Sequence, residues 1–341
     1  MFSMKQFFIV LGVCSYHGDS CMLVFCRGVL VVFTCFFSTF LCAADNVDVS
    51  DPEQLWIATP LTKEKSFTLG IEGPACDRQG NVYAVCYEKD QTIGKIAPNG
   101  KGELWVTLTN ASAGNGIVFD KSGLMYVADY GAHNVLQIDP KTKEIKVFLH
   151  EPKMNQPNDL AIGPDDVLWA SDPNWTAGTG QVWRIGRDAK VTLVAEKMGT
   201  TNGIDVSPDG KILYVNESVQ RNVWAFDIQS NGTLVNKRLL KQFPDHGFDG
   251  MRCDVEGNLF ITRYGKGTVA VLSPKGEVLR EIDVLGESPS NLCFGGPDGR
   301  TVYVTEVKKQ RLVQFRVEKP GLSWQRLQKH EPSASNDKSP K

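Results

Sequence analysis

The chain has 341 residues, with 37 Lys and Arg against 39 Asp and Glu and a formal net charge of -2. Neither Lys nor Arg forms a run, so the composition excludes a general attraction to nucleic acid or to an anionic membrane surface. The length allows one large domain or two ordinary ones.

The N-terminal segment has the pattern of a secretory signal peptide. Arg27 precedes residues 28–44, which read GVLVVFTCFFSTFLCAA and end in small residues, and a polar stretch follows. The apolar core of about 14 residues is short for a membrane span. We therefore expect residues 1–44 to be a signal peptide. Cleavage would leave a mature protein in the periplasm or outside the cell, free of the membrane.

Two alternatives to this interpretation remain open. Residues 7–14 form a second apolar run, which would suit a retained membrane anchor. Residues 1–21 are unusual ahead of a signal peptide, and Met22 is itself a reasonable start, so these residues are equally well described as a mis-assigned extension.

A repeated segment occupies most of the remaining chain. Six copies occur, and their opening residues are 43, 43, 44, 47 and 41 positions apart: Glu72, Asn115, Asn158, Asn202, Asp249 and Ser290. A repeat of this length made of short strands is typical of a propeller. Because blades are not stable alone, the repeat indicates one domain, which we place at residues 45–329.

Each copy contains four runs of strand character. In the second copy these are residues 116–120, 124–129, 134–140 and 144–150, rich in Val, Ile, Phe and Tyr and separated by turn residues. The sequence therefore predicts an all-β, six-bladed propeller with four antiparallel strands per blade.

The segments that flank the repeat, and the turns within it, also carry predictions. A glycine such as Gly80 supplies the positive φ of the turn between the first two strands, and Asp166 replaces it in the third copy. Residues 54–70 include a further strand-like run, which we expect to pair with the last blade and close the ring. Residues 330–341 are polar and predicted to be disordered.

Nine cysteines occur, of which five lie in the leader. The predicted mature domain keeps Cys76, Cys86, Cys253 and Cys293. Export would permit disulfides in any of three connectivities, whereas buried free thiols in apolar strands are the alternative. No cysteine and histidine spacing suggests a zinc site.

The opening residues of the six copies predict a metal site. The first strands of the blades line the channel and run the same way, so the residues at their starts should meet at one mouth. Two carboxylates, three amides and one hydroxyl form an all-oxygen set, which suits Ca²⁺, with Mg²⁺ or Mn²⁺ as alternatives. Asn or Asp followed by Gly is also common in turns, which is the simpler interpretation of any single position.

These motifs resemble a known family. The strings IEGPACDRQGNVY, PNDLAIGPDDVLWASDP, TNGIDVSPDGKILYV and FDGMRCDVEGNLFI are similar to the senescence marker protein (regucalcin), gluconolactonase and luciferin-regenerating enzyme family, over about residues 68–317. The resemblance implies a six-bladed propeller that binds one divalent cation in the channel mouth and hydrolyses lactones.

The resemblance also implies roles for individual residues. Carried over motif by motif, it assigns the metal ligands to Glu72, Asn158, Asn202 and Asp249, and leaves Asn115 as a substrate contact. Ca²⁺ is the expected cation, with Mg²⁺, Mn²⁺ or Zn²⁺ as alternatives. The substrate would be a small lactone or ester, and we expect a monomer.

Lactone hydrolysis needs a polarised carbonyl and a base for the attacking water. We expect Asp249 to be that base, with Glu72 in reserve, although a ligated carboxylate is less basic. Asp172 is a second candidate and an expected substrate contact, unless it is an ordinary loop residue. Arg263, at the end of its strand, is an expected contact for a substrate carboxylate or hydroxyl, or else has a surface role. His246 is either a proton shuttle or, as the simpler interpretation, a loop histidine without a function.

One position departs from the family pattern. Sugar-lactone-hydrolysing members that resemble regucalcin carry Arg two residues before the P-N-D asparagine, where it contacts substrate, and this chain has Gln156 there. We expect Gln156 to contact substrate; the metal site survives this change, whereas the assignment of an aldonolactone substrate is weakened. Trp175 and Trp183 nearby could offer apolar walls or pack between blades. A non-catalytic binding propeller with a structural cation, and a phosphotriesterase-like activity, remain alternatives.

Overall fold

A computed structural model describes residues 55–109 and 111–329 of the chain. The predicted signal peptide (1–44) and the predicted disordered tail (330–341) lie outside the described residues, so both stay predictions. Within the described residues, no helix is long and apolar enough to cross a membrane.

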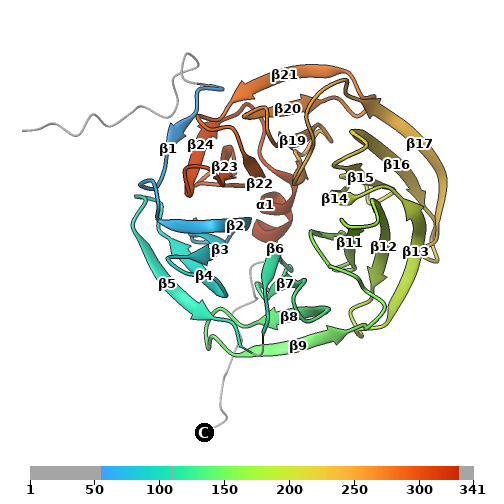
Figure 1. Cartoon of the computed structure of the whole chain (residues 1–341), viewed down its shortest axis with the longest axis horizontal. Helices are drawn as coiled ribbons and strands as arrows, with labels where there is room; N and C mark the ends of the chain where they lie inside the picture. Colours follow the sequence, from blue (N-terminus) through green and yellow to red (C-terminus); the bar gives the residue numbers. More distant parts are fainter. Residues whose placement is uncertain (1–54, 110, 330–341) are drawn as a thin grey trace, which may run out of the picture. The chain divides into compact units, whose positions relative to one another are not determined.

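The strands form six antiparallel four-stranded sheets, as the repeat predicts. In the first three blades the strands are, from the centre outward, β2 (Phe67–Cys76), β3 (Val82–Tyr87), β4 (Thr92–Ile96) and β5 (Gly102–Thr107); β6 (Gly114–Phe119), β7 (Met125–Asp129), β8 (Asn134–Ile138) and β9 (Ile145–His150); and β10 (Leu160–Ile162), β11 (Leu168–Asn174), β12 (Thr179–Ile185) and β13 (Val191–Met198). Figure 1 shows the sheets following one another around a centre, each with its first strand innermost.

The remaining blades repeat this order. They contain β14 (Thr201–Val206), β15 (Ile212–Glu217), β16 (Asn222–Ile228) and β17 (Leu234–Gln242); β18 (Met251–Cys253), β19 (Leu259–Arg263), β20 (Thr268–Leu272) and β21 (Val278–Asp283); and β22 (Pro289–Gly295), β23 (Thr301–Glu306) and β24 (Arg311–Arg316), with β1 (Thr59–Pro60) outermost.

The last blade therefore contains strands from both ends of the described chain. Thr59 pairs with Gln314 and Pro60 with Val313, and a further bridge joins Leu55 to Arg316. This pairing confirms the expectation that the segment before the first copy closes the ring. It also identifies the closing strand as the outermost one, which leaves β24 paired on both sides.

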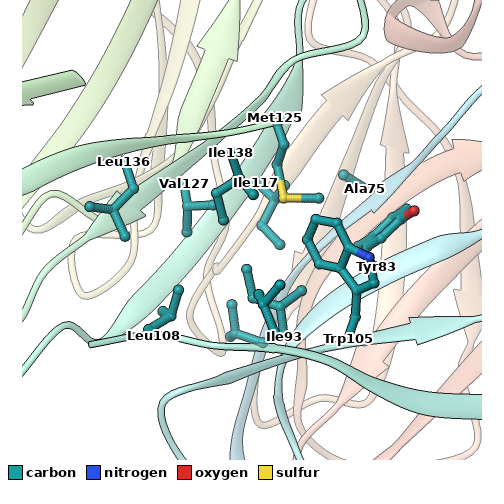
Figure 2. Packing of buried hydrophobic residues seen from close by; sticks show 12 residues of the cluster. Ala75, Tyr83, Ile93, Trp105, Leu108, Ile117, Met125, Val127, Leu136 and Ile138 are labelled. Carbon is teal, nitrogen blue, oxygen red and sulfur yellow. The ribbon is translucent and has the colours of Figure 1, made fainter. Parts of the chain in front are cut away.

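The hydrophobic core lies between neighbouring blades. Figure 2 shows one such cluster, in which Tyr83 and Trp105 of the first blade pack with Ile117 and Met125 of the second. The rings of Tyr83 and Trp105 meet edge to face, with their centroids 4.8 Å apart. Because a blade buries its faces only against its neighbours, the sheets depend on one another for stability.

The turns behave as their residues predict. Gly80 has a φ of 82° in the first blade, and Asp166 adopts a φ of 59° at the equivalent turn of the third. The four cysteines within the described residues are free thiols, so the structure favours the buried-thiol alternative over a disulfide.

One short helix, α1 (Leu322–Gln328), was not predicted from the sequence. Its Arg326 donates hydrogen bonds to the carbonyl oxygens of Ile162 (2.7 Å) and Ser207 (3.0 Å), at the far ends of two first strands. Leu322 and Leu327 are buried. The first strands begin at one mouth of the channel, and the helix covers the other mouth. In Figure 1 it lies at the centre.

Trp56 tests how much the closure contributes to stability. Its ring stacks on Phe260, with 6.3 Å between centroids, and the Arg280 guanidinium lies 4.5 Å from the ring centroid. The backbone N–H of Trp56 donates to the Arg316 carbonyl, a bond that an alanine would keep. We expect Trp56→Ala to lower the free energy of unfolding by about 2 kcal/mol in urea denaturation, because packing and a cation–π contact are lost together.

A matched control is available for this substitution. Trp175 is 44% exposed and lies away from the closure, so Trp175→Ala should change the free energy of unfolding by less than about 0.5 kcal/mol. Equal effects of the two substitutions would contradict a special role for the closure.

Candidate active site

The six opening residues of the repeat meet in one cavity. Its volume is about 1230 Å³, and all six of these residues line it: Glu72, Asn115, Asn158, Asn202, Asp249 and Ser290. Gln156 and His246 line it as well. The structure therefore brings together the residues that the propeller geometry selected.

Hydrogen bonds between blades position this ring. The N–H of Gly116, which follows Asn115, donates to the Asn158 carbonyl at 2.9 Å, and the N–H of Gly203, which follows Asn202, donates to the Asp249 carbonyl at 3.0 Å. The glycines allow this approach, since a Cβ on Gly203 would lie 2.6 Å from the Asp249 oxygen. These two glycines do not have positive φ, so their role is close contact rather than a turn.

Glu72 and Asp249 are close enough to perturb each other. Burial raises the pKa of Glu72 to about 7, with a further increase from the negative charge of Asp159. Burial and then the charge of Glu72 raise the pKa of Asp249 well above its usual value. Two such carboxylates resist ionising together unless a positive charge joins them.

The amide oxygens of the ring also need a partner. Asn202 donates from its side-chain nitrogen to the Ser218 hydroxyl at 3.1 Å, which leaves its oxygen free. That oxygen and the Asn115 side-chain oxygen are buried without a hydrogen-bond partner. Buried acceptors without partners are costly, and together with two carboxylates they suit a hard divalent cation.

This donor set does not resemble a zinc or other soft-metal site. In residues 55–109 and 111–329, no group of three or more His, Cys, Asp or Glu side chains could hold a metal ion. Any cation here would need amide oxygens in addition to the two carboxylates, which favours Ca²⁺ or Mg²⁺ over softer metals.

A buried ion pair lies beneath the ring. The Arg252 guanidinium donates two hydrogen bonds to the Asp159 carboxylate, at 2.6 and 2.8 Å, and their side chains are 5% and 0% exposed. Arg252 also lowers the pKa of Glu72 by its positive charge, in part offsetting burial. The sequence pattern did not single out this pair, although each member lies within three positions of a ring residue.

The structure corrects the prediction for Asp172. This side chain is fully buried and is absent from the described lining of the cavity. Its carboxylate accepts hydrogen bonds from the Asn155 and Gln156 N–H groups, from Gln181 and from the Trp183 indole at 2.8 Å. Asp172 therefore holds the backbone of Gln156 in place from behind the cavity wall.

The same correction applies to Arg263. Its side chain is 0% exposed, stacks on the Phe243 ring at 4.1 Å and donates to the Asp245 carboxylate at 2.8 Å. It is not part of the described cavity lining. Arg263 binds Asp245, which precedes His246 and Asp249, and so holds this segment in place. Its guanidinium pairs with the carboxylates of Asp245 and Glu281 instead of facing a substrate.

Apolar side chains around the mouth were largely missed from the sequence. Of the two tryptophans considered, Trp175 lines the cavity and Trp183 packs in a core cluster. The cavity is also lined by exposed or half-buried apolar residues from the other blades: Leu69, Tyr130, Val219, Tyr264 and Val307. In five copies their signal in the sequence is an apolar residue one or two positions after the second strand, which resembles an ordinary strand end, whereas Leu69 lies within β2.

The fold and the cavity define a six-bladed propeller with an oxygen-rich pocket at one channel mouth. Residues 106–308 match the SMP-30/Gluconolactonase/LRE-like region, and the chain belongs to that family. It is 26% identical to the gluconolactonase of Zymomonas mobilis over 285 residues, 73% of this chain and 79% of the relative.

Two further comparisons agree with this family assignment. The chain is 26% identical to the diisopropyl-fluorophosphatase of Loligo vulgaris over 310 residues, 79% of this chain and 94% of the relative. Its fold matches a luciferin-regenerating enzyme with a TM-score of 0.67 at 20% identity, over 78% of this chain and 97% of that one. The chain is thus a member of a gluconolactonase-like family whose named relatives include several hydrolases.

The buried ion pair can be tested by removing one or both partners. Arg252→Met leaves the Asp159 carboxylate buried without a counter-ion, and we expect the free energy of unfolding to fall by about 3–5 kcal/mol. The double variant Asp159→Leu/Arg252→Met should lose less, because no isolated charge remains. If urea denaturation showed the double variant to be as unstable as the single one, the charge itself would not be the cause.

The raised pKa of Glu72 predicts how stability depends on pH. Without metal, the raised pKa of Glu72 keeps a proton on its carboxyl up to about pH 7, whereas in the unfolded chain the same group has its ordinary pKa of 4.5. The folded state binds more protons in this window, so its stability should fall as pH rises through it. We expect chelator-treated protein to be more stable at pH 5 than at pH 7.5, and Glu72→Gln to show a smaller difference. A larger difference in the variant would contradict this assignment.

Proposed function

We propose that this protein is a metal-dependent hydrolase that opens lactones, with one divalent cation, Ca²⁺ in the first instance, held by Glu72, Asn158, Asn202 and Asp249. The observation that carries the proposal is the unpartnered Asn202 oxygen in the same cavity as two carboxylates of raised pKa. The gluconolactonase of Zymomonas mobilis, which matches over most of its length, supports the reaction class.

The cation, when bound, supplies a Lewis acid for the ester carbonyl and for the oxyanion that forms as water attacks. The side chains supply the rest. Asp249 is placed to take the proton of the attacking water, with Glu72 in reserve. Three backbone contacts hold Asp249: its N–H donates to the Thr262 carbonyl, and its carbonyl accepts from Gly203 and from the Asn216 side chain. Asn115 and Gln156 line the same cavity, and in this proposal they contact the substrate.

We propose export to the periplasm or the cell exterior on the basis of residues 1–44 alone. The setting is compatible with this site, because Ca²⁺ is more abundant outside cells than in the cytoplasm. The free cysteines neither support nor oppose export, since buried thiols persist in either compartment.

A second candidate function is hydrolysis of phosphotriesters. It is favoured by the similarity to the squid diisopropyl-fluorophosphatase, which spans 94% of that relative. A site that polarises C=O polarises P=O by the same electrostatic means. An organophosphate triester therefore belongs in the substrate panel beside the lactones.

The test is hydrolysis of a lactone panel by chelator-treated protein, with Ca²⁺, Mg²⁺, Mn²⁺ or Zn²⁺ restored. We expect turnover only with metal, and a loss of about 10²-fold or more in kcat for Asp249→Asn. Asp283→Asn is the matched control, because Asp283 is exposed on the outer strand β21, and it should keep full activity.

Two outcomes would contradict the proposal. Metal-independent turnover that Asp249→Asn retains would remove the carboxylates from the reaction. Tight stoichiometric metal binding without turnover of any lactone would identify a binding propeller with a structural cation.

A further inference from the structure

A second ring of residues surrounds the polar one. In five blades, the residue one or two positions after the second strand is apolar and lines the cavity, and the first blade supplies an apolar residue from β2 instead. We call this set the apolar collar: Leu69, Tyr130, Trp175, Val219, Tyr264 and Val307.

The collar is built by the same geometry as the polar ring. Second strands run antiparallel to first strands, so the ends of the second strands lie at the mouth where the first strands begin. A residue directly after the second strand thus stands above the ring residue of its blade. Tyr130 follows β7, Trp175 follows β11 and Tyr264 follows β19. The collar is therefore a feature of the repeat rather than a chance cluster.

Its side chains are unusually open to solvent for their type. Leu69 is 67% exposed and Val219 is 63% exposed, while Trp175 and Tyr264 are 44% and 42% exposed. Contiguous exposed apolar surface around a cavity is typical of a ligand-binding site. Each of these side chains would gain by being covered with apolar surface.

The charged side chains around the cavity offer little binding energy to an anionic group beside the collar. Glu72, Asp90 and Asp249 line it, and its described lining contains no lysine. Arg221 is present, but its guanidinium donates to the Pro244 carbonyl at 2.8 Å. A phosphate, sulfonate or carboxylate group on a substrate would meet carboxylates and apolar groups here.

The size of the cavity favours a substrate that is larger than a simple lactone. Ligand pockets commonly measure about 300–1,000 Å³, and this cavity of about 1230 Å³ exceeds that range. An unsubstituted or sugar lactone bound at the polar ring would leave the collar empty. Gln156 adds to this, because it lines the wall without a charge to offer a polyhydroxy acid.

We propose that the substrate is a lactone or ester bearing an alkyl or aryl substituent, whose ester group reaches the polar ring while the substituent lies against the apolar collar. This inference rests on the proposed hydrolase function and names its substrate class. The collar contributes binding energy through apolar contact, and the polar ring performs the chemistry.

The test compares three lactones in the metal-loaded enzyme: δ-valerolactone, δ-decalactone, which adds a pentyl chain to the same ring, and glucono-δ-lactone. We expect kcat/KM for δ-decalactone to exceed that for δ-valerolactone by about tenfold or more. In Trp175→Ala/Tyr264→Ala this ratio should fall at least about fivefold, chiefly through a higher KM for δ-decalactone.

Two controls separate the collar from general damage. Trp175→Phe/Tyr264→Phe keeps apolar rings and should retain most of the preference. Leu279→Ala removes a side chain that is 53% exposed on the outer strand β21, and should leave the ratio unchanged.

Four results would overturn the inference. If glucono-δ-lactone were the best substrate, the collar would not bind the substrate as proposed. The same would hold if the double alanine variant did not change the ratio. Either result would leave the hydrolase proposal intact. Sedimentation with phosphatidylcholine vesicles that is lost in the variant, at an unchanged ratio, would show that the collar contacts lipid instead. No turnover of any lactone with any metal would overturn both proposals together.

Discussion

Hydrogen bonds from one first strand to the next, at the channel mouth, are the interactions on which the site depends. A glycine follows a ring residue and donates to the carbonyl of the next one, as Gly116 does to Asn158 and Gly250 to Ser290. These bonds form only if every blade holds its place in a closed ring. The pairing of β1 with β24 supplies that closure, so a short outermost strand supports the ring that carries the site.

The site is formed at a cost to stability. Glu72 and Asp249 lie close together with raised pKa values, and two amide oxygens are buried without partners. Each of these features destabilises a metal-free fold, and blade-to-blade packing must offset them. The buried pair below acts on Glu72 in both directions, because the charge of Asp159 raises the pKa of Glu72 and the charge of Arg252 lowers it. A cation would remove several unfavourable terms at once.

Two rings of residues surround the same channel mouth, and we assign them different roles in binding a substrate. The inner ring is polar and comes from the starts of the first strands, while the apolar collar comes from the ends of the second strands. Relatives in sequence include proteins named gluconolactonase and diisopropyl-fluorophosphatase, so the names within this set of relatives refer to chemically different substrates. Changes in the collar can alter the substrate without disturbing the ring that holds the reacting group.

The sequence alone determined the propeller, its blade number and the residues of the polar ring, because a repeat of fixed period places equivalent residues at equivalent points in space. It did not determine which polar side chains near the ring are free to meet a ligand. Asp172 lies two residues before the end of β11 and Arg263 ends β19, close to the collar residues that follow these strands, yet both side chains are buried and bind protein groups instead. Only the tertiary structure decided this, because the orientation of a side chain near a strand end depends on partners from other strands and loops, such as Trp183 and Asp245.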